Sequence, residues 1–111
     1  MRPLSGLAAV CALALVLPLT ACKKPSVKTC DKACRNASVL LFWETADAEI
    51  AAAPEAERAA LRAQKEAEYQ TGFERGIDLC ITQCQSADND DQNTCLIKAK
   101  TAADIHACTK K

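Results

Sequence analysis

The sequence has few aromatic residues, few glycines and one histidine, and each shortage limits what the chain can be. Its aromatic residues are Phe42, Trp43, Tyr69 and Phe73. With so few large side chains in 111 residues, one small domain with a modest core is expected. The three glycines and the single histidine form no phosphate-binding loop, nucleophile elbow or zinc-protease motif. We therefore predict a protein that is not an enzyme and holds no cofactor.

An excess of charge of either sign is also lacking. The 14 basic side chains balance the 14 acidic ones, and this balance gives no indication of nucleic-acid binding. The acidic run Asp88-Asn89-Asp90-Asp91 lacks the alternating ligands and the terminal glutamate of a calcium loop, so it is interpreted as a polar break with helix-capping residues. His106 is interpreted as a favourable partner for a helix C-terminus. No metal site is predicted.

A long apolar run occurs only at the N-terminus. Leu7 to Leu17 is about eleven residues long, which is too short for a transmembrane helix but typical of a signal peptide. The following Leu19-Thr20-Ala21-Cys22 resembles the lipobox of bacterial lipoproteins. The resemblance implies that residues 1–21, with Cys11, are removed and that Cys22 carries a diacylglyceryl group on sulfur and an acyl chain on its amino group. The alternative is an ordinary secretory signal cut nearby, with Cys22 as a thiol.

The lipobox resemblance implies a location in the bacterial cell envelope, with the membrane reached through lipid on Cys22. Two or three acyl chains make such an anchor stable. In a cell with two membranes, Lys23 rather than aspartate after the lipidated cysteine resembles the sorting pattern for the outer membrane. Residues 22–28 contain Pro25, Ser26 and three lysines, and they are interpreted as a short tether.

Cysteine, in contrast, is abundant, and two pairs share one spacing. Of eight cysteines, six stay available once Cys11 is removed and Cys22 is acylated. An even number outside the cytoplasm predicts three disulfides, for which six cysteines allow fifteen connectivities. Cys30 and Cys34, like Cys80 and Cys84, have three residues between them, so each pair lies on one face of a helix.

Two antiparallel helices would bring the first cysteine of one pair to the second of the other. This arrangement predicts disulfides Cys30–Cys84 and Cys34–Cys80, with the turn centred near residue 57, close to Pro54. A bridge within one pair is set aside, because side chains at i and i+4 do not converge as a disulfide requires.

The residues between these cysteines predict the two helices. Residues 29–53 contain no glycine or proline, which predicts one helix capped by Thr29 and ended by Pro54. Glu55 to about Ser86 predicts a second helix of roughly 30 residues. In that helix Gly72 and Gly76 mark a bend, a close approach by another backbone, or merely two tolerated glycines.

The rest of the chain predicts a smaller unit packed on this hairpin of residues 29–86. Residues 87–111 are expected to form two short helices, the first over Gln92–Lys100 and the second opened by a capping box from Thr101 to Asp104. A sharp corner between them would join Cys95 and Cys108 in the third disulfide. The predicted fold class is therefore all-α: an antiparallel hairpin held by two disulfides, plus a C-terminal helix pair held by a third.

The paired cysteines of residues 28–86 resemble the twin-CX3C helical hairpins of the small intermembrane-space and coiled-coil-helix families. Those families include chaperones, assembly factors and copper carriers. The resemblance implies the hairpin and its two disulfides, and it assigns no function.

A second apolar face on the first helix suggests a binding role. At 100° per residue the residues nearly opposite the cysteines are Val39, Trp43 and Ile50, with Phe42 beside them. Leu96, Ile97 and Ile105 are expected to cover Val39 and Trp43. Nine residues of helix returning from Cys84 reach only about 13 Å, so the surface near Ile50 is expected to stay open.

We therefore predict a lipid-anchored, non-catalytic binding or envelope-structural protein. Its partner would be another protein or a second copy, contacted through Val39, Phe42, Trp43 and Ile50. The alternative is a metal-binding or thiol-redox protein in which the CX3C cysteines, if reduced, hold zinc or copper(I).

Overall fold

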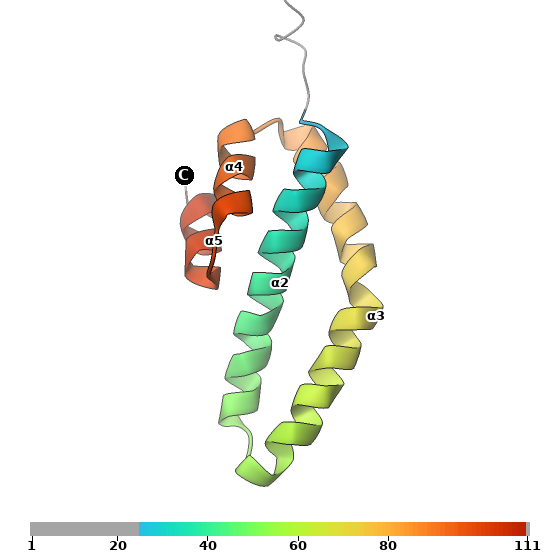
Figure 1. The fold of residues 1–111 in the computed structure, drawn as a ribbon, viewed down its shortest axis with the longest axis vertical. Helices are drawn as coiled ribbons and strands as arrows, with labels where there is room; N and C mark the ends of the chain where they lie inside the picture. The colour runs from blue at the N-terminus through green and yellow to red at the C-terminus, as the bar shows by residue number, and fades with distance from the viewer. Residues whose placement is uncertain (1–24, 111) are drawn as a thin grey trace, which may run out of the picture.

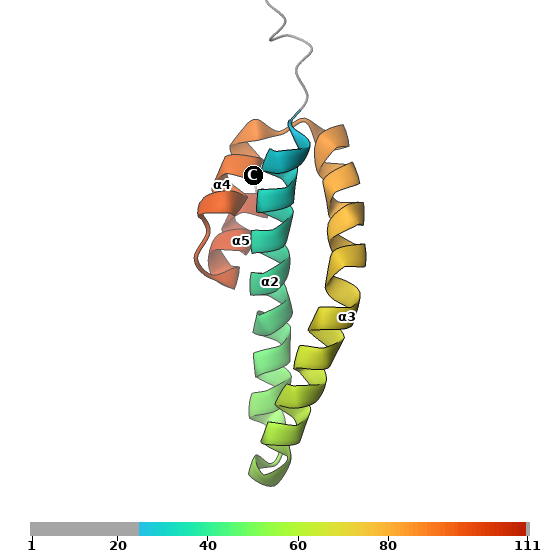
Figure 2. The same ribbon diagram turned by 45° about the vertical axis from the view of Figure 1, so that its right-hand side comes forward.

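The computed structural model describes residues 25–110, which form four helices and no strand. The helices are α2 (Val27–Ala52), α3 (Glu55–Ala87), α4 (Asp90–Lys98) and α5 (Ala102–Thr109). In both ribbon views α2 lies between α3 on one side and the short pair α4 and α5 on the other (Figures 1 and 2). The predicted all-α fold, a hairpin with a C-terminal helix pair, is confirmed.

Three disulfides join these helices in the predicted connectivity. Cys30–Cys84 and Cys34–Cys80 link α2 to α3, with Cα atoms 5.8 and 5.9 Å apart. Cys95–Cys108 links α4 to α5, with Cα atoms 5.8 Å apart. The predicted lipidation residue Cys22, the signal segment 1–21 and the first part of the tether lie outside the described residues.

The first helix begins earlier than predicted, and its capping residue is different. Ser26, rather than Thr29, is the N-cap of α2, and its side-chain oxygen accepts a hydrogen bond from the Thr29 backbone N–H at 3.0 Å. Both residues have hydroxyl groups suited to capping. Ser26 takes the role because its backbone is extended and its side chain reaches the N–H three residues on, whereas Thr29 already lies inside the helix.

The core surrounds α2 and consists mainly of small side chains and cysteines. Its buried apolar residues are Cys30, Ala33, Cys34, Ala46, Ile50, Ile77, Ala99, Ile105 and Cys108. α4 and α5 both pack against α2, whereas α3 packs mainly against α2. Asn36 fixes the end of α4, because its side-chain amide donates to the carbonyl oxygens of Leu96 and Ala99 at 2.7 and 2.9 Å. These bonds satisfy carbonyl groups that a helix end leaves without partners.

The turn between the long helices is completed by an arginine of α3. Arg58 donates to the carbonyl oxygen of Ala53 at 3.0 Å and to that of Ala51 at 3.1 Å. Its charge also suits the negative end of the α2 dipole. Pro54 precedes the first residue of α3, so the position of the turn agrees with the prediction.

The junction of α3 and α4 contains a strained residue. Asp88, which ends α3, has φ 50° and ψ 51°, and it is the only residue other than glycine with positive φ among those described. This left-handed conformation disfavours side chains with a Cβ and suits glycine. We expect Asp88→Gly to raise the free energy of unfolding by up to about 1 kcal/mol. Urea unfolding measures this free energy. Asp88→Ala is the control variant, and it should be no more stable than the wild type because alanine has a Cβ. Equal stability of the two variants would contradict backbone strain at Asp88.

The capping box predicted at the start of α5 is confirmed. Asp104 accepts hydrogen bonds from the backbone N–H groups of Lys100 and Thr101 at 2.9 and 3.0 Å, and its own N–H donates to the Thr101 hydroxyl at 3.1 Å. The bond from the Lys100 backbone, followed by those involving Thr101, lowers the pKa of Asp104.

This lowered pKa predicts an acid-sensitive contribution to stability. Because the folded-state pKa lies below the unfolded value of about 4, the contribution is present above pH 4 and is lost as pH falls through the folded pKa. The stability difference between the wild type and Asp104→Ala should therefore be present at pH 6 and shrink toward pH 2. Chemical unfolding across this range measures it, and a difference independent of pH would contradict the role of the carboxylate.

Candidate functional site

All four aromatic side chains of the protein gather between α2 and α3. Phe42 packs edge-on against Trp43 with ring centroids 5.2 Å apart. Tyr69 contacts Phe42 at 5.2 Å, Trp43 at 6.1 Å and Phe73 at 4.6 Å between centroids. Each of the four is half-buried. We call Phe42, Trp43, Tyr69 and Phe73 the aromatic cluster; it holds the two helices together between the disulfides and the turn.

An arginine lies at each end of the aromatic cluster. The Arg35 guanidinium is 5.7 Å from the Phe73 ring centroid, and that of Arg62 is 5.8 Å from Trp43. Such contacts attract the cation to the ring face. The aromatic cluster is therefore flanked by an arginine side chain toward the disulfides and another toward the turn.

Both arginines also bridge to carboxylates. Arg35 donates two parallel hydrogen bonds to Glu74, at 2.7 and 2.9 Å, and a third to Asp31 at 2.9 Å. The bond from Arg35 lowers the pKa of Glu74, and the bond to Glu74, followed by that to Asp31, raises the pKa of Arg35. Arg62 donates to Asp47 at 3.1 Å. Arg35–Glu74 and Arg62–Asp47 join α2 to α3, whereas Arg35–Asp31 lies within α2. These exposed pairs add little stability each.

Two hollows open beside the aromatic cluster. The first, the Gly72 hollow, has a volume of about 230 Å³ and is lined by Ser38, Phe42, Glu68, Tyr69, Gly72, Phe73 and Gly76. The second, the Val39 hollow, has a volume of about 510 Å³ and is lined by Asp31, Lys32, Arg35, Asn36, Val39, Tyr69, Phe73 and Ile97. Tyr69 and Phe73 line both hollows, so these two rings can be reached from two directions.

The glycines of α3 leave the first of these hollows open. A Cβ added at Gly72 or at Gly76 would meet no atom within 4 Å, so no other backbone of the described chain approaches them closely. Of the three predicted alternatives, a close approach by another backbone of the described chain is therefore wrong. α3 is one continuous helix through both positions.

The structure does not keep Val39, Phe42, Trp43 and Ile50 together on one open face. Ile50 is only 6% exposed, which contradicts the expectation that the surface around it stays open. Trp43 packs on Tyr69 and Arg62 of α3 instead of lying opposite that helix. Val39 lines the Val39 hollow together with Ile97, as expected for a residue near the C-terminal helices, whereas Phe42 lines the other hollow.

The face of α2 that contacts α3 changes along the helix, and this change explains why the prediction failed. The helical wheel fixed the contact face at the cysteines and assumed that it continues straight along α2. Phe42 comes eight residues after Cys34, which places it roughly 80° farther around the helix at 100° per residue. Because Phe42 nevertheless contacts α3, the line of contact turns around α2 and brings Trp43 within reach of Tyr69.

The large exposed hydrophobic side chains among the described residues are Val27 and Leu79, which are 56% and 62% exposed.

The cysteines form structural bridges in this geometry. Cys30, Cys34 and Cys108 are at most 3% exposed, and all six sulfurs of the described chain are paired. Residues 25–110 contain no group of three or more His, Cys, Asp or Glu side chains that could hold a metal ion. His106 bonds Glu44 of α2 at 2.9 Å, so it helps to position α5.

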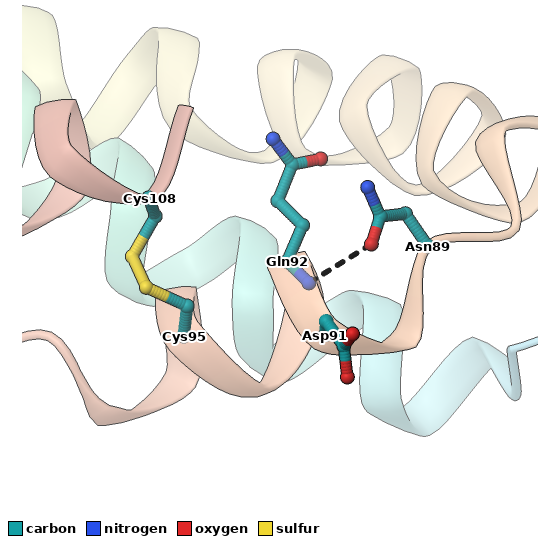
Figure 3. A pocket seen from close by; sticks show the side chains of 5 residues that line it. All are labelled: Asn89, Asp91, Gln92, Cys95 and Cys108. Atoms are coloured by element: carbon teal, nitrogen blue, oxygen red, sulfur yellow. Dashed lines mark hydrogen bonds between the residues drawn. A yellow bond between two sulfur atoms is a disulfide. The ribbon is translucent and has the colours of Figure 1, made fainter. Parts of the chain in front are cut away.

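A further hollow of about 240 Å³ lies beside the Cys95–Cys108 disulfide, and it is lined by Asn89, Asp91, Gln92, Cys95 and Cys108. Asn89 is the N-cap of α4, and its side-chain oxygen accepts from the Gln92 N–H at 3.0 Å. Figure 3 shows the side chains of Gln92 and Asp91 pointing away from each other. The polar groups do not converge on one point, and the interpretation of this segment as a helix cap is confirmed.

Asn93 is the buried polar residue of the core. It is 5% exposed, its Nδ2 has no hydrogen-bond partner, and its Oδ1 lies 3.3 Å from the sulfur of Cys84. A disulfide sulfur carries no proton and cannot donate, so the opposite orientation of this amide, with Nδ2 toward the sulfur, makes better chemical sense. Asn93 thereby packs α4 against the end of the hairpin.

Comparisons with protein-family models, curated proteins and solved structures give no match to this chain. Within the part of the chain that the structure describes, no helix has the length and apolar character needed to cross a membrane.

Proposed function

We propose that this chain is a lipid-anchored helical protein of the bacterial cell envelope that binds another protein, or a second copy of itself, beside the aromatic cluster and catalyses no reaction. In a cell with two membranes its location would be the outer membrane. One observation carries the binding role: Tyr69 and Phe73 line both hollows. The same two rings are thus available to a partner from either face of the hairpin.

The chemistry of the aromatic cluster favours binding. Aromatic and arginine side chains supply most of the energy at protein interfaces when they fill pockets at the centre of the contact. Tyr69 and Phe73 are already held by ring contacts and by Arg35, so a partner would lose little affinity in ordering them. Gly72 and Gly76 leave room for a partner's side chains next to the rings.

The state of the cysteines favours the binding role over the alternative of metal or redox chemistry. Zinc and copper(I) are bound by thiolates, whereas the four CX3C sulfurs form disulfides in this fold. A metal site would therefore need reduction of both bridges between α2 and α3. The lipobox at Cys22 supports an oxidising location, where disulfides persist.

Photocrosslinking in intact cells tests the binding role. A photoreactive amino acid at Gly76 would project into the open side of the Gly72 hollow, and the matched control is Asp78, which lies about 200° farther around α3. We expect one discrete adduct from position 76, with a protein partner or at twice the mass of the chain, and none from position 78. Equal capture at the two positions, or no adduct at 76, would contradict binding at this hollow.

A further inference from the structure

We infer that the disulfide-joined end of the hairpin rests on an anionic phospholipid surface through the first turns of α2, so that the hairpin stands away from the membrane. The inference depends on the proposed lipid anchor at Cys22. It concerns a separate property, namely which end and which helix of the fold face the lipid.

The length of the tether limits the position of α2. Cys22 precedes Val27, the first residue of α2, by five residues, which span at most about 18 Å when fully extended. The start of α2, the end of α3 and the start of α4 all lie at the same end of the molecule (Figure 1). A lipid on Cys22 therefore keeps this end close to the bilayer.

The side chains at the start of α2 suit a lipid surface. Val27 is 56% exposed, and an apolar side chain at this place can enter the headgroup region. Lys28 and Lys32 follow on the same helix and are exposed, and basic residues near a bilayer are attracted to anionic headgroups. Asp31 lies among them, but it is paired with Arg35 at 2.9 Å.

The same end also contains acidic residues, and these decide which side makes contact. Asp88, Asp90 and Asp91 lie at the corner between α3 and α4, and all are exposed. Anionic headgroups repel this corner. The contact therefore falls on the α2 side, and the corner of α3 and α4 is held away from the surface.

This orientation places the aromatic cluster well above the bilayer. Phe42 lies about 22 Å beyond Val27 along α2, and Trp43 about 24 Å, at 1.5 Å per residue. The Gly72 hollow has no lining residue in the first turns of α2, so a partner could reach it from the side without obstruction by the lipid surface. The Val39 hollow includes Lys32, so its end nearest the disulfides lies close to the lipid.

Tryptophan fluorescence in vesicles tests this orientation with the lipidated mature protein. The vesicles contain phosphatidylethanolamine and phosphatidylglycerol with brominated acyl chains, which quench tryptophan on contact. We expect the wild type, with Trp43 as its only tryptophan, to be unquenched. The tryptophan introduced in Val27→Trp should be mostly quenched by the brominated chains. The tryptophan introduced in Ala56→Trp, near the turn, should not be quenched. Exchanging Lys28 and Lys32 for glutamate should weaken the quenching of Val27→Trp without releasing the protein.

The outcomes separate the orientation from the anchor. Quenching of Trp43 in vesicle-bound wild type, or unquenched emission from Val27→Trp, would overturn the orientation while the anchor stands. Quenching that is unchanged by the lysine exchange would overturn the role of the anionic surface. Failure of the mature protein to sediment with vesicles would overturn the lipid anchor and this inference with it.

Discussion

Replacing all four hairpin cysteines with alanine should leave the protein largely unfolded. Cys30–Cys84 joins residues 54 positions apart, and closing such a loop stabilises a protein by about 4 kcal/mol in the chain-entropy model. The second bridge, four residues inside the first, adds a smaller amount. The free energy of unfolding of a small domain is only about 5–15 kcal/mol, and this core contains few large side chains. Circular dichroism during urea unfolding measures the effect.

Comparison among the bridges makes this prediction specific. Removing Cys34 and Cys80 alone should cost less than removing all four cysteines, because Cys30–Cys84 still closes the long loop. Removing Cys95 and Cys108, which are 13 positions apart, should cost about 3 kcal/mol by the same model and should disturb mainly α4 and α5. An unchanged unfolding midpoint in the four-cysteine variant would show that the aromatic cluster holds the hairpin without the bridges.

Tyr69→Ala should lower the free energy of unfolding by about 2–3 kcal/mol, because truncating a packed aromatic side chain removes both buried area and ring contacts. Tyr69 is the only ring that contacts the three others. Both ring contacts between α2 and α3 involve Tyr69, so its loss would leave no aromatic contact between the two long helices. Thermal unfolding of the oxidised protein measures the loss.

Two variants control for this prediction. Tyr69→Phe retains the ring and should change stability little, because the Tyr69 hydroxyl makes no hydrogen bond among the described residues. Gln70→Ala, at the exposed neighbouring position, should also have little effect. If Tyr69→Ala unfolds at the same temperature as Gln70→Ala, the aromatic cluster does not hold the helices together.

The hairpin was predictable because its strongest signals are covalent and local. The spacing of Cys30, Cys34, Cys80 and Cys84 places each pair on one face of a helix. The turn near Pro54 makes the helices antiparallel, and that direction determines the pairing. The capping box from Thr101 to Asp104 depends on residues three apart, so it is visible in the sequence as well. Such features need no knowledge of how side chains pack at a distance.

The candidate site was less predictable because it depends on how α3 turns around α2. A straight wheel placed Trp43 opposite α3, but the turning contact brings it to Tyr69 and Arg62. Long side chains add a second difficulty. Arg58 reaches the end of α2, and Arg35 reaches Glu74 across 39 residues of sequence. Such contacts follow from the rotation of the helices and leave no periodic pattern in the sequence.

We propose that the cysteines of the mature chain serve the lipid anchor and the fold rather than metal binding or redox chemistry. Intact mass measurement of the mature protein, purified from membranes and alkylated under denaturing conditions without reductant, tests it most directly. We predict a chain that begins at Cys22, carries fatty acyl groups and takes up no alkylating agent. Four alkylated cysteines in a protein purified with bound zinc or copper, or an unacylated chain, would contradict the claim.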